Sequence, residues 1–238
     1  MEQLTEVDQR SRGDVPSRGS APLVDVRVVL FTVRDGQLLI ALRERDSCHA
    51  LPRWVPSLDE SLDAAATRIL ADQIGGAERY KEQLYSVSHG WESNRTVTVT
   101  YLALAAAEAA DVKPGSTAWF NPNAPGELDP VDRMIVDYAL LRLRAKLEYT
   151  AIAFHLLPPS FTLSELQSVY EVVLDREVDK RNFRRRIHAA GLLEVTGESR
   201  REGSHRPARL YRLRTAHDAE TYLTPAWTSQ PARKVTSQ

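Results

Sequence analysis

The chain has 238 residues, of which 42% are hydrophobic and 26% are charged, and its formal net charge is −1. This length favours two domains over one. The only cysteine, Cys48, excludes an internal disulfide framework and a zinc site made from several cysteines. No apolar run reaches the length of a membrane span and the first residues are polar, so we expect a cytoplasmic protein without a signal peptide or a membrane partner.

The two ends of the chain differ from its middle in composition. Residues 1–20 are rich in Arg, Ser, Gly and acidic residues and have almost no apolar periodicity, and residues 216–238 are similar. Such segments bury too little apolar surface to fold. We therefore predict five segments: a disordered tail at 1–20, a first domain at 21–130, a connecting helix at 131–157, a second domain at 158–215 and a C-terminal tail at 216–238.

The first domain has the pattern of several strands around one long helix. Apolar and polar residues alternate over residues 23–28 and again over 96–101, and Asp35-Gly36 favours a hairpin turn. A helix is predicted over residues 61–74, where it is followed by two glycines. Mixed strands around one long helix indicate an α+β or an α/β/α domain.

A long helix is predicted between the two domains. Apolar residues recur at near-helical spacing over residues 131–157, and Pro158 and Pro159 end the pattern. The segment lacks the flanking heptad charges of a coiled coil. We therefore expect it to join the two domains and to add to the core of the second, a position from which it could transmit a ligand signal.

The second domain begins with a well-marked helix start. Thr162 followed by Glu165 fits a capping box, and Phe161 with Leu166 fits the hydrophobic staple that fixes how the chain enters a helix. The apolar residues that follow recur at helical spacing. This helix is therefore expected to bury one face.

A strongly basic second helix follows. Residues 179–187 contain five cations, and residues 180–193 contain no acid. Phe183 and Ile187 lie on an apolar stripe, and Gly191 suits a left-handed helix end. Another face carries Arg181, Arg184, Arg185 and His188. A basic face without acids is what the groove and phosphates of a DNA duplex require, although a merely solvated face has the same composition.

A basic hairpin is predicted after this helix. Residues 192–196 and 209–213 are strand-like, and the connection at 197–208 contains four arginines or histidines together with glycines. Helix, helix and hairpin is the order of a winged helix-turn-helix domain. Residues 160–214 hold twelve Lys and Arg against eight Asp and Glu, a local net charge of +4 that suits contacts with phosphates.

We expect the DNA contacts of this domain to come from both helices and from the hairpin. Arg206 is placed to reach the minor groove or the backbone, and Arg186, beside the apolar stripe, suits a phosphate or structural role. Two such domains in a symmetric dimer would enter successive major grooves of a palindromic operator. The candidate DNA-binding residues are Thr162, Ser164, Lys180, Arg181, Asn182, Arg184, Arg185, Arg186, Arg201, Arg206 and Arg209.

In the first domain, residues 51–60 and 68–75 resemble the Nudix signature G-x5-E-x7-R-E-U-x-E-E-x-G-U, in which U is aliphatic. The resemblance implies a Nudix-like α/β/α sandwich. The register fits at Glu60, Arg68, Leu70 and Gly75. It fails where the chemistry of the family resides: Trp54 replaces the opening Gly, Ile69 replaces the Glu after the Arg, Asp72-Gln73 replaces the acidic pair, and Gly76 replaces the closing aliphatic residue.

The altered positions of the signature decide whether the domain can hold a metal. Positions 69, 72 and 73 share one helix face because they are three and four residues apart. In Nudix enzymes this face carries carboxylates, since Mg²⁺ requires oxygen ligands. We therefore predict no metal ligand, no catalytic residue and no cofactor, with Glu60 and Arg68 as a structural pair. The alternative is a Nudix-type hydrolase that uses the atypical acid set Glu44, Glu60 and Asp72.

The resemblance extends through the second domain. Taken over residues 23–214, the chain is similar to the Nudix-related transcriptional regulators of the NrtR family. The similarity implies an α+β chain with an N-terminal Nudix-like sensing domain and a C-terminal winged helix-turn-helix. It also implies a homodimeric repressor of NAD or related cofactor genes that binds a palindromic operator in double-stranded DNA. The segments that carry the similarity are residues 139–149, 156–158, 161–167, 169–171, 179–185 and 206–212.

The effector implied by this resemblance is ADP-ribose or another NAD-related nucleotide, and some relatives respond to sugars. The chain departs from the family pattern at three places: Arg53-Trp54 stands for Gly-Gly, residues 90–95 stand for an Arg-Asp-Pro-Arg segment, and Val131-Asp132 stands for Asp-His. Arginine binds phosphate through two donors and tryptophan stacks on bases. The candidate ligand-binding residues are Arg43, Arg45, Trp54 and Arg95. The alternative is three surface arginines and a core tryptophan.

Overall fold

The computed structural model describes residues 21–44, 48–78, 80–90, 95–109, 117–201 and 207–214. Both predicted tails lie outside these ranges, as do the candidate residues Arg45 and Arg206.

A seven-stranded mixed sheet forms the centre of the first domain. Its main path runs β3-β2-β1-β6-β5, with β4 paired to β1 and β7 paired to β2. The β1–β6 pair is parallel, whereas the other pairs are antiparallel. The strands are β1 (Leu23–Arg34), β2 (Gln37–Glu44), β3 (His49–Ala50), β4 (Arg53–Trp54), β5 (Tyr80–His89), β6 (Thr96–Leu104) and β7 (Thr117–Phe120).

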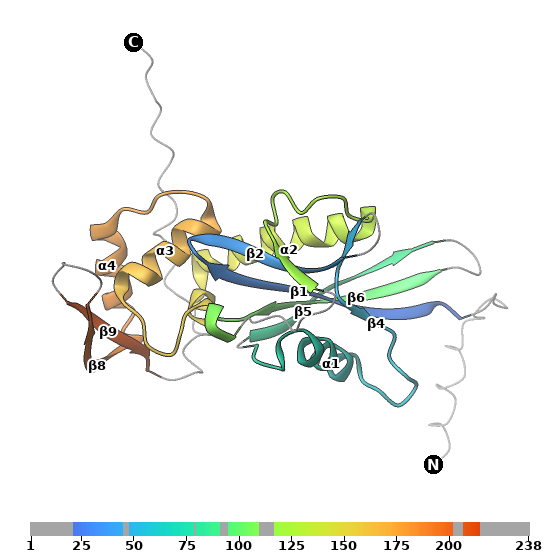
Figure 1. Cartoon of the computed structure of the whole chain (residues 1–238), viewed down its shortest axis with the longest axis horizontal. Helices are drawn as coiled ribbons and strands as arrows, with labels where there is room; N and C mark the ends of the chain where they lie inside the picture. Colours follow the sequence, from blue (N-terminus) through green and yellow to red (C-terminus); the bar gives the residue numbers. More distant parts are fainter. Residues whose placement is uncertain are drawn as a thin grey trace, which may run out of the picture.

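Two helices cover opposite faces of this sheet (Figure 1). On one face lies α1 (Leu62–Ile74), which begins at the Ser61 cap and ends at Gly75 with a positive φ of 68°. The other face is covered by α2 (Pro130–Tyr149). Strand β1 is buried on both sides because each face of the sheet has its own apolar layer. The predicted α/β/α architecture and the predicted bounds of the first helix are confirmed.

The second domain has the predicted order of helix, helix and hairpin, and it lies at one end of the molecule (Figure 1). Just before α3, Phe161 pairs with Tyr211 of β9, which ties the hairpin to the helices. Rings of Tyr170 and Phe183 pack 5.3 Å apart between α3 and α4. The elements of this domain are α3 (Leu163–Leu174), α4 (Lys180–Ala189), β8 (Leu193–Arg200) and β9 (Ala208–Leu213). The first domain also contains a short 3-10 helix, η2 (Ala107–Ala109).

The predicted connecting helix over residues 131–157 is wrong in its second part. Helix α2 ends at Tyr149, Thr150 is extended, and a separate 3-10 helix follows, η3 (Ile152–Leu156). The Thr150 hydroxyl donates to the Lys146 carbonyl at 2.7 Å and so satisfies the end of α2. The apolar residues after the break recur every third position, a spacing that fits both helix types. The apolar periodicity therefore gave no sign that α2 ends at Tyr149, and the predicted helix extended beyond it.

The predicted hairpin is also wrong in its bounds. Strand β8 continues to Arg200, and the register between β8 and β9 shifts between Val195 and Ser199. Gly197, the first residue of the predicted connection, has a φ of 83° and lies inside this irregularity. Glycine inside a strand often marks a bulge rather than an end. The connection between the strands is therefore limited to residues 201–207.

The two domains share one apolar core. Buried leucines of the second half of α2, such as Leu143 and Leu147, belong to the same cluster as Leu156 of η3 and Leu166 of α3. The expectation that the connecting segment adds to the core of the second domain is confirmed. Over the described part of the chain, no helix is long and apolar enough to cross a membrane.

Candidate DNA interface and effector site

Helix α4 is held by its apolar stripe and presents its basic side to solvent. Its start is capped by Asp179, whose side chain accepts a hydrogen bond from the Asn182 amide at 2.7 Å. Phe183 and Ile187 are buried against the core. The charged positions Arg181 and Arg185 are exposed. The sequence folds this way because the apolar stripe can be buried only if the arginines point outward.

One exposed arginine of α4 already has a fixed direction. Arg185 Nη2 donates to Asn182 Oδ1 at 2.8 Å, and this bond within α4 sets the direction of the guanidinium. Lys180 and His188 are exposed, and Arg186 is half-buried, as its place beside the apolar stripe predicts. Within the residues that the structure describes, neither Arg181 nor Arg185 forms an ion pair. Their charge is therefore available to an external anion.

Arg184 does not lie on the fully free face that we predicted for it. Its side chain is half-buried, and Nη2 donates to Ser164 Oγ at 3.3 Å, across the gap between α4 and the first turn of α3. Ser164 is exposed. The structure thus brings together two candidate DNA-binding residues, Arg184 of α4 and Ser164 of α3. They meet because the turn between the two helices places this part of α4 beside the first turn of α3.

Thr162 serves as the cap of α3. Thr162 Oγ1 accepts from the Glu165 amide at 3.1 Å, and Glu165 Oε2 accepts from the Thr162 amide at 2.6 Å, which confirms the predicted capping box. The residue is only 5% exposed. Of the two predicted contacts in this turn, Ser164 is the one whose hydroxyl faces outward.

Arg200 is a positioning residue that the sequence did not reveal. It lies at the end of β8, where Nη1 contacts Glu165 Oε1 at 2.6 Å and Nη2 donates to the Ser160 carbonyl at 3.4 Å. The wing is thereby fastened to the capping box of α3. The sequence grouped Arg200 with the cations of the hairpin connection. One signal could have indicated its role: the glutamate of a capping box uses one carboxylate oxygen for the cap, which leaves the other oxygen to accept from a cation. Arg201 and Arg209 are exposed.

The helix face that holds metal in Nudix enzymes is closed in this chain. Ile69 and Gln73 are both buried against the sheet, and Gln73 Oε1 accepts a hydrogen bond from the Thr117 hydroxyl of β7. Asp72 is exposed. Across the described ranges, no three His, Cys, Asp or Glu side chains lie together as a metal site. The alternative acid set of Glu44, Glu60 and Asp72 is therefore not gathered into one site.

Glu60 and Arg68 form the structural pair that we predicted, and the pair also fixes Trp54. Glu60 Oε1 accepts from Arg68 Nε at 2.8 Å, and Oε2 accepts from Trp54 Nε1 at 3.0 Å. The Arg68 guanidinium lies 5.1 Å from the centre of the indole ring. The hydrogen bond from Arg68 holds the pKa of Glu60 below its ordinary value. Trp54 is 41% exposed, so the interpretation of it as a core tryptophan is wrong.

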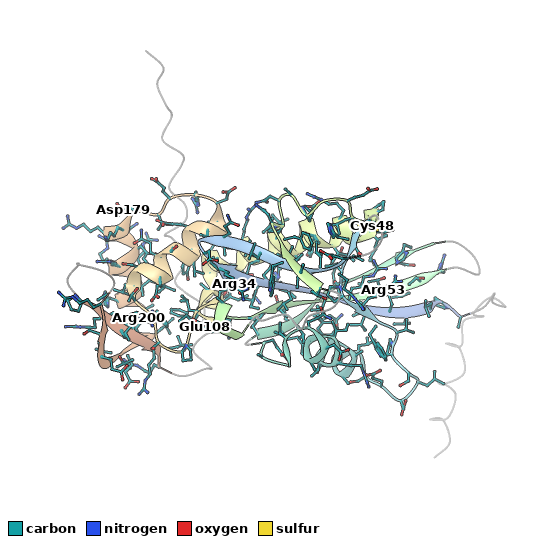
Figure 2. The ribbon with its side chains drawn as sticks, viewed as in Figure 1. Arg34, Cys48, Arg53, Glu108, Asp179 and Arg200 are labelled. Carbon is teal, nitrogen blue, oxygen red and sulfur yellow. The ribbon has the colours of Figure 1, made fainter. Side chains whose placement is uncertain are left out.

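The two described arginines of the candidate effector site do not gather around Trp54. Trp54 pairs with Val26 of β1, which is level with Val99 of β6. Arg95 stands four residues before Val99, about 13 Å along the strand at the usual rise. Arg43 is exposed on the part of β2 that pairs with β3 and β7. Arg53, next to Trp54, is exposed and is the nearer cation by sequence (Figure 2).

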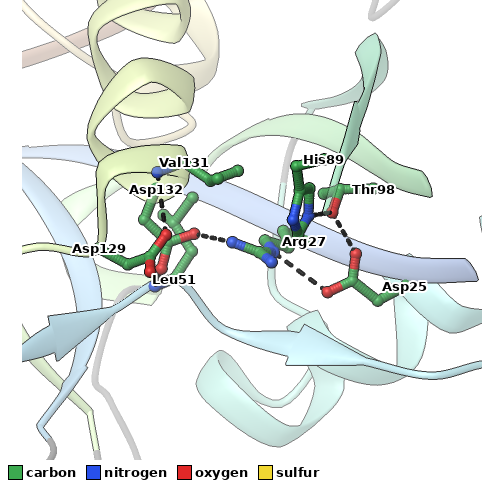
Figure 3. Close-up of polar contacts among 8 residues, drawn as sticks. All are labelled: Asp25, Arg27, Leu51, His89, Thr98, Asp129, Val131 and Asp132. Atoms are coloured by element: carbon green, nitrogen blue, oxygen red, sulfur yellow. Dashed lines mark hydrogen bonds and ion pairs between the residues drawn. The ribbon is translucent and has the colours of Figure 1, made fainter. Parts of the chain in front are cut away.

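A buried charged network links the sheet to α2, and the sequence did not predict it. Arg27 Nε contacts Asp25 Oδ2 at 3.1 Å, and Arg27 Nη1 contacts Asp132 Oδ1 at 2.5 Å (Figure 3). The Thr98 hydroxyl donates to Asp25, and His89 Nε2 lies 3.0 Å from the Thr98 oxygen. Burial alone would lower the pKa of Arg27, but the charges of Asp132 and Asp25 outweigh it and raise the pKa above its ordinary value.

In the sequence, Asp25 and Arg27 alternate with apolar residues, a pattern that is also typical of a strand with one solvated face. They are 3% and 5% exposed because α2 brings Asp132 over this part of the sheet. An alternating pattern does not distinguish a solvated face from a face whose polar side chains are paired and buried.

These features define a class of protein before any comparison is made. A winged helix-turn-helix domain with an exposed basic helix shares one apolar core with an α/β/α domain. In that α/β/α domain, two of the positions that hold metal in Nudix enzymes are buried against the sheet. This architecture is that of a DNA-binding regulator with an attached sensing domain. The model of the NrtR DNA-binding winged helix domain matches residues 153–213.

Similar proteins extend this match to the first domain. The chain is 35% identical over 219 residues to the ADPR responsive transcriptional repressor NtrR of Acinetobacter baylyi, a match that covers 86% of each chain. It also matches the crystal structure of Shewanella oneidensis NrtR complexed with a 27mer DNA, with a TM-score of 0.77, 31% identity, and coverage of 85% of this chain and 98% of that chain. A MutT/nudix family protein from Enterococcus faecalis, 21% identical with a TM-score of 0.65 over 85% of this chain and 90% of that chain, shares the fold.

The chain belongs to the NrtR family of transcriptional regulators. The predicted family, the predicted fold class and the prediction of a transcriptional regulator agree with these matches.

Proposed function

We propose that this protein represses transcription by binding double-stranded DNA through α4 and the β8–β9 hairpin, and that its Nudix-fold domain senses ADP-ribose or another NAD-related nucleotide. The observation that carries the DNA-binding part is the outward face of α4, where Arg181 and Arg185 are exposed without ion pairs among the described residues. The similar repressor of Acinetobacter baylyi is ADPR responsive, which supports the choice of effector.

In this proposal, the side chains of α4 and its surroundings have different tasks. Arg181 and Arg185 read base edges or adjacent phosphates, because both are exposed and neither forms an ion pair among the described residues. Arg184 and Ser164 form one unit that contacts the backbone where α3 meets the duplex. Lys180, Asn182, Arg186, Arg201, Arg206 and Arg209 contribute phosphate contacts around this centre. These contacts give affinity that falls steeply with salt.

We further propose a symmetric homodimer that binds a palindromic operator. A single recognition helix covers only a few base pairs, and two copies related by a two-fold axis read half-sites about 34 Å, or a small multiple of that distance, apart. The functional division then follows the segments expected from the sequence: sensing by residues 21–130, connection by 131–157 and DNA binding by 158–215. The regulated genes in this proposal belong to NAD or related cofactor metabolism.

The proposed effector site centres on Trp54. Its indole is held by Glu60 and Arg68 and still has 41% of its surface exposed, so it offers an ordered aromatic face to a base. Arg53, on the same strand as Trp54, and Arg43, on β2, are exposed cations of a kind that suits phosphates. Arg95 is a peripheral contact in this arrangement. We propose that the domain binds its nucleotide without hydrolysing it, because Ile69 and Gln73 occupy the positions where carboxylates would hold Mg²⁺.

Fluorescence anisotropy with duplexes from the chain's own genomic neighbourhood tests this function. We expect saturable binding to one palindromic duplex in preference to a scrambled duplex of equal length, and a lower affinity in the presence of ADP-ribose or a related nucleotide. Equal affinity for operator and scrambled duplexes at physiological salt would overturn the regulator. Specific binding that no NAD-related nucleotide alters would leave the DNA-binding part standing and remove the sensor.

A further inference from the structure

Asp132 connects its own helix, α2, to two other parts of the chain. It lies in the first turn of α2, its Oδ1 contacts Arg27 of β1 at 2.5 Å, and its Oδ2 accepts a hydrogen bond from the Leu51 amide at 3.0 Å (Figure 3). Both oxygens are therefore used, one by the sheet and one by the segment between β3 and β4. The side chain is almost fully buried, as are Arg27 and Leu51.

The bond to Leu51 is costly to break. Leu51 is completely buried, so its amide has no water to replace the carboxylate as acceptor. Asp132 is in turn held by Arg27, and a carboxylate in the first turn of a helix is favoured by the helix dipole. A displacement of the β3–β4 segment must therefore move Asp132 with it or leave a buried amide and a buried carboxylate unpaired.

The β3–β4 segment carries the proposed effector contact. The chain runs from Leu51 through Pro52 and Arg53 to Trp54, and the Pro52 carbonyl accepts from the Val28 amide at 3.0 Å. Only two residues, Pro52 and Arg53, separate the Asp132 contact at Leu51 from Trp54. A nucleotide that stacks on Trp54 and pulls this strand therefore acts close to Leu51.

The other end of α2 reaches the DNA-binding domain. Arg144 Nε donates to the Val173 carbonyl of α3 at 2.9 Å, and Leu147 lies in the core that α3 shares. Because α2 has 20 residues, it spans about 30 Å as one rod. A shift at its first turn is thus carried to the helix on which α4 packs.

We propose that Asp132 is the positioning residue through which the Leu51–Trp54 segment and α2 move together, so that nucleotide bound at Trp54 alters the placement of the winged helix. The inference rests on the proposed function. It adds a specific physical connection, namely a carboxylate shared by the effector segment, the sheet and the helix between the domains.

Asp25 provides a matched control within the same network. It is as buried as Asp132 and contacts the same arginine, but its other contact is Thr98 of β6, so it touches neither the β3–β4 segment nor α2. Asp25→Asn and Asp132→Asn remove the same charge from Arg27. Only Asp132→Asn also weakens the link between the effector segment and α2.

The experiment measures operator affinity of the full-length variants with and without saturating ADP-ribose, and ADP-ribose affinity by calorimetry. In the wild type, the ratio of the two operator affinities is the coupling factor. We expect Asp132→Asn to bind both partners but to reduce this factor at least about fivefold, within the usual range of allosteric coupling, and Asp25→Asn to keep it within about twofold. An unchanged factor in Asp132→Asn, or an equal loss in both variants, would overturn the inference. A wild type without coupling would instead overturn the proposed function.

Hydrogen exchange in the wild type keeps the inference testable if Asp132→Asn does not fold. We expect saturating ADP-ribose to change the exchange rate of the Leu51 amide and of the first turn of α2 together. Calorimetric binding of ADP-ribose without a change at either place would contradict the coupling.

Discussion

Arginine is placed in opposite electrostatic settings at the two ends of this molecule. In the Nudix-fold domain, Arg27 is buried between Asp25 and Asp132 and fixes α2 to the sheet. In the winged helix, Arg181 and Arg185 are exposed on a helix that follows its Asp179 cap without another acid up to residue 193. The same residue type holds the structure together where carboxylates neutralise it and remains available to an external anion where they do not.

This difference has consequences for stability and for binding. A buried ion network contributes little over an apolar core, but removing one partner leaves uncompensated charge and is strongly destabilising. Exposed cations contribute little to stability, and their neutralisation by phosphates releases counterions and drives DNA binding. Substitutions at Arg27 should therefore change folding, and substitutions on α4 should change affinity for DNA.

The largest expected effect is on the stability of Arg27→Met. This change keeps an unbranched apolar stem but removes the guanidinium and leaves two buried carboxylates without their cation, so the free energy of unfolding should fall by about 3–5 kcal/mol in urea denaturation. Arg133→Met is the control, because Arg133 forms an exposed ion pair with Asp137 on the surface of α2 and should cost less than about 1 kcal/mol. Equal losses in the two variants would contradict the distinction between the settings.

The next effect concerns the exposed side of the comparison. Arg185→Ala should weaken operator binding by about 1–3 kcal/mol and relax specificity at one base pair if Arg185 reads a guanine, while the stability of the protein stays unchanged. Arg142→Ala, an exposed arginine on α2, should bind operator like the wild type. If Arg181→Ala, Arg184→Ala and Arg185→Ala all retain wild-type affinity and specificity, α4 is not the recognition helix.

A smaller effect separates two adjacent arginines of the wing. Arg201 is exposed, so Arg201→Ala should weaken all duplexes alike and reduce the slope of log affinity against log salt by about 1. Arg200 is paired with Glu165 of α3, so Arg200→Met should lower affinity through a loosened wing while the salt slope stays near that of the wild type. If both variants reduce the salt slope equally, Arg200 contacts a phosphate, and its role in holding the wing to α3 is contradicted.

The sequence predicted local features whose causes are local. The capping box of Thr162 and Glu165, the helix end at Gly75 and the apolar stripe through Phe183 depend on residues within a few positions of one another, and the structure confirms each. The eroded Nudix signature was also readable, since Ile69 and Gln73 stand at fixed spacing from Glu60. These features determined the fold class and the location of the basic helix.

Features that depend on distant segments were missed. The alternating pattern around Asp25 and Arg27 is typical of a strand with one solvent-exposed face. In the structure, Asp132, which lies 105 residues after Arg27 in the sequence, contacts Arg27 and buries this face. The end of α2 at Thr150 was not predicted because the apolar spacing fits both an α-helix and a 3-10 helix. The hydrogen bond from Arg184 to Ser164 was not predicted because it depends on the geometry of the turn between α3 and α4. Sequence patterns report periodicity along one element, whereas pairing between elements is decided by packing.

The smallest expected effect is the absence of any change in hydrolysis on Asp72→Asn. Among helix positions 69, 72 and 73, Asp72 is the one carboxylate left, and it is exposed while Ile69 and Gln73 are buried against the sheet. A single carboxylate does not satisfy the oxygen coordination and charge that Mg²⁺ requires. Wild type and Asp72→Asn should therefore release no phosphate-containing product from ADP-ribose above a no-protein blank with Mg²⁺ or Mn²⁺, while calorimetry detects nucleotide binding in both. Multiple turnovers in the wild type that Asp72→Asn abolishes would show that the domain retains catalysis and would restore the hydrolase with an atypical acid set.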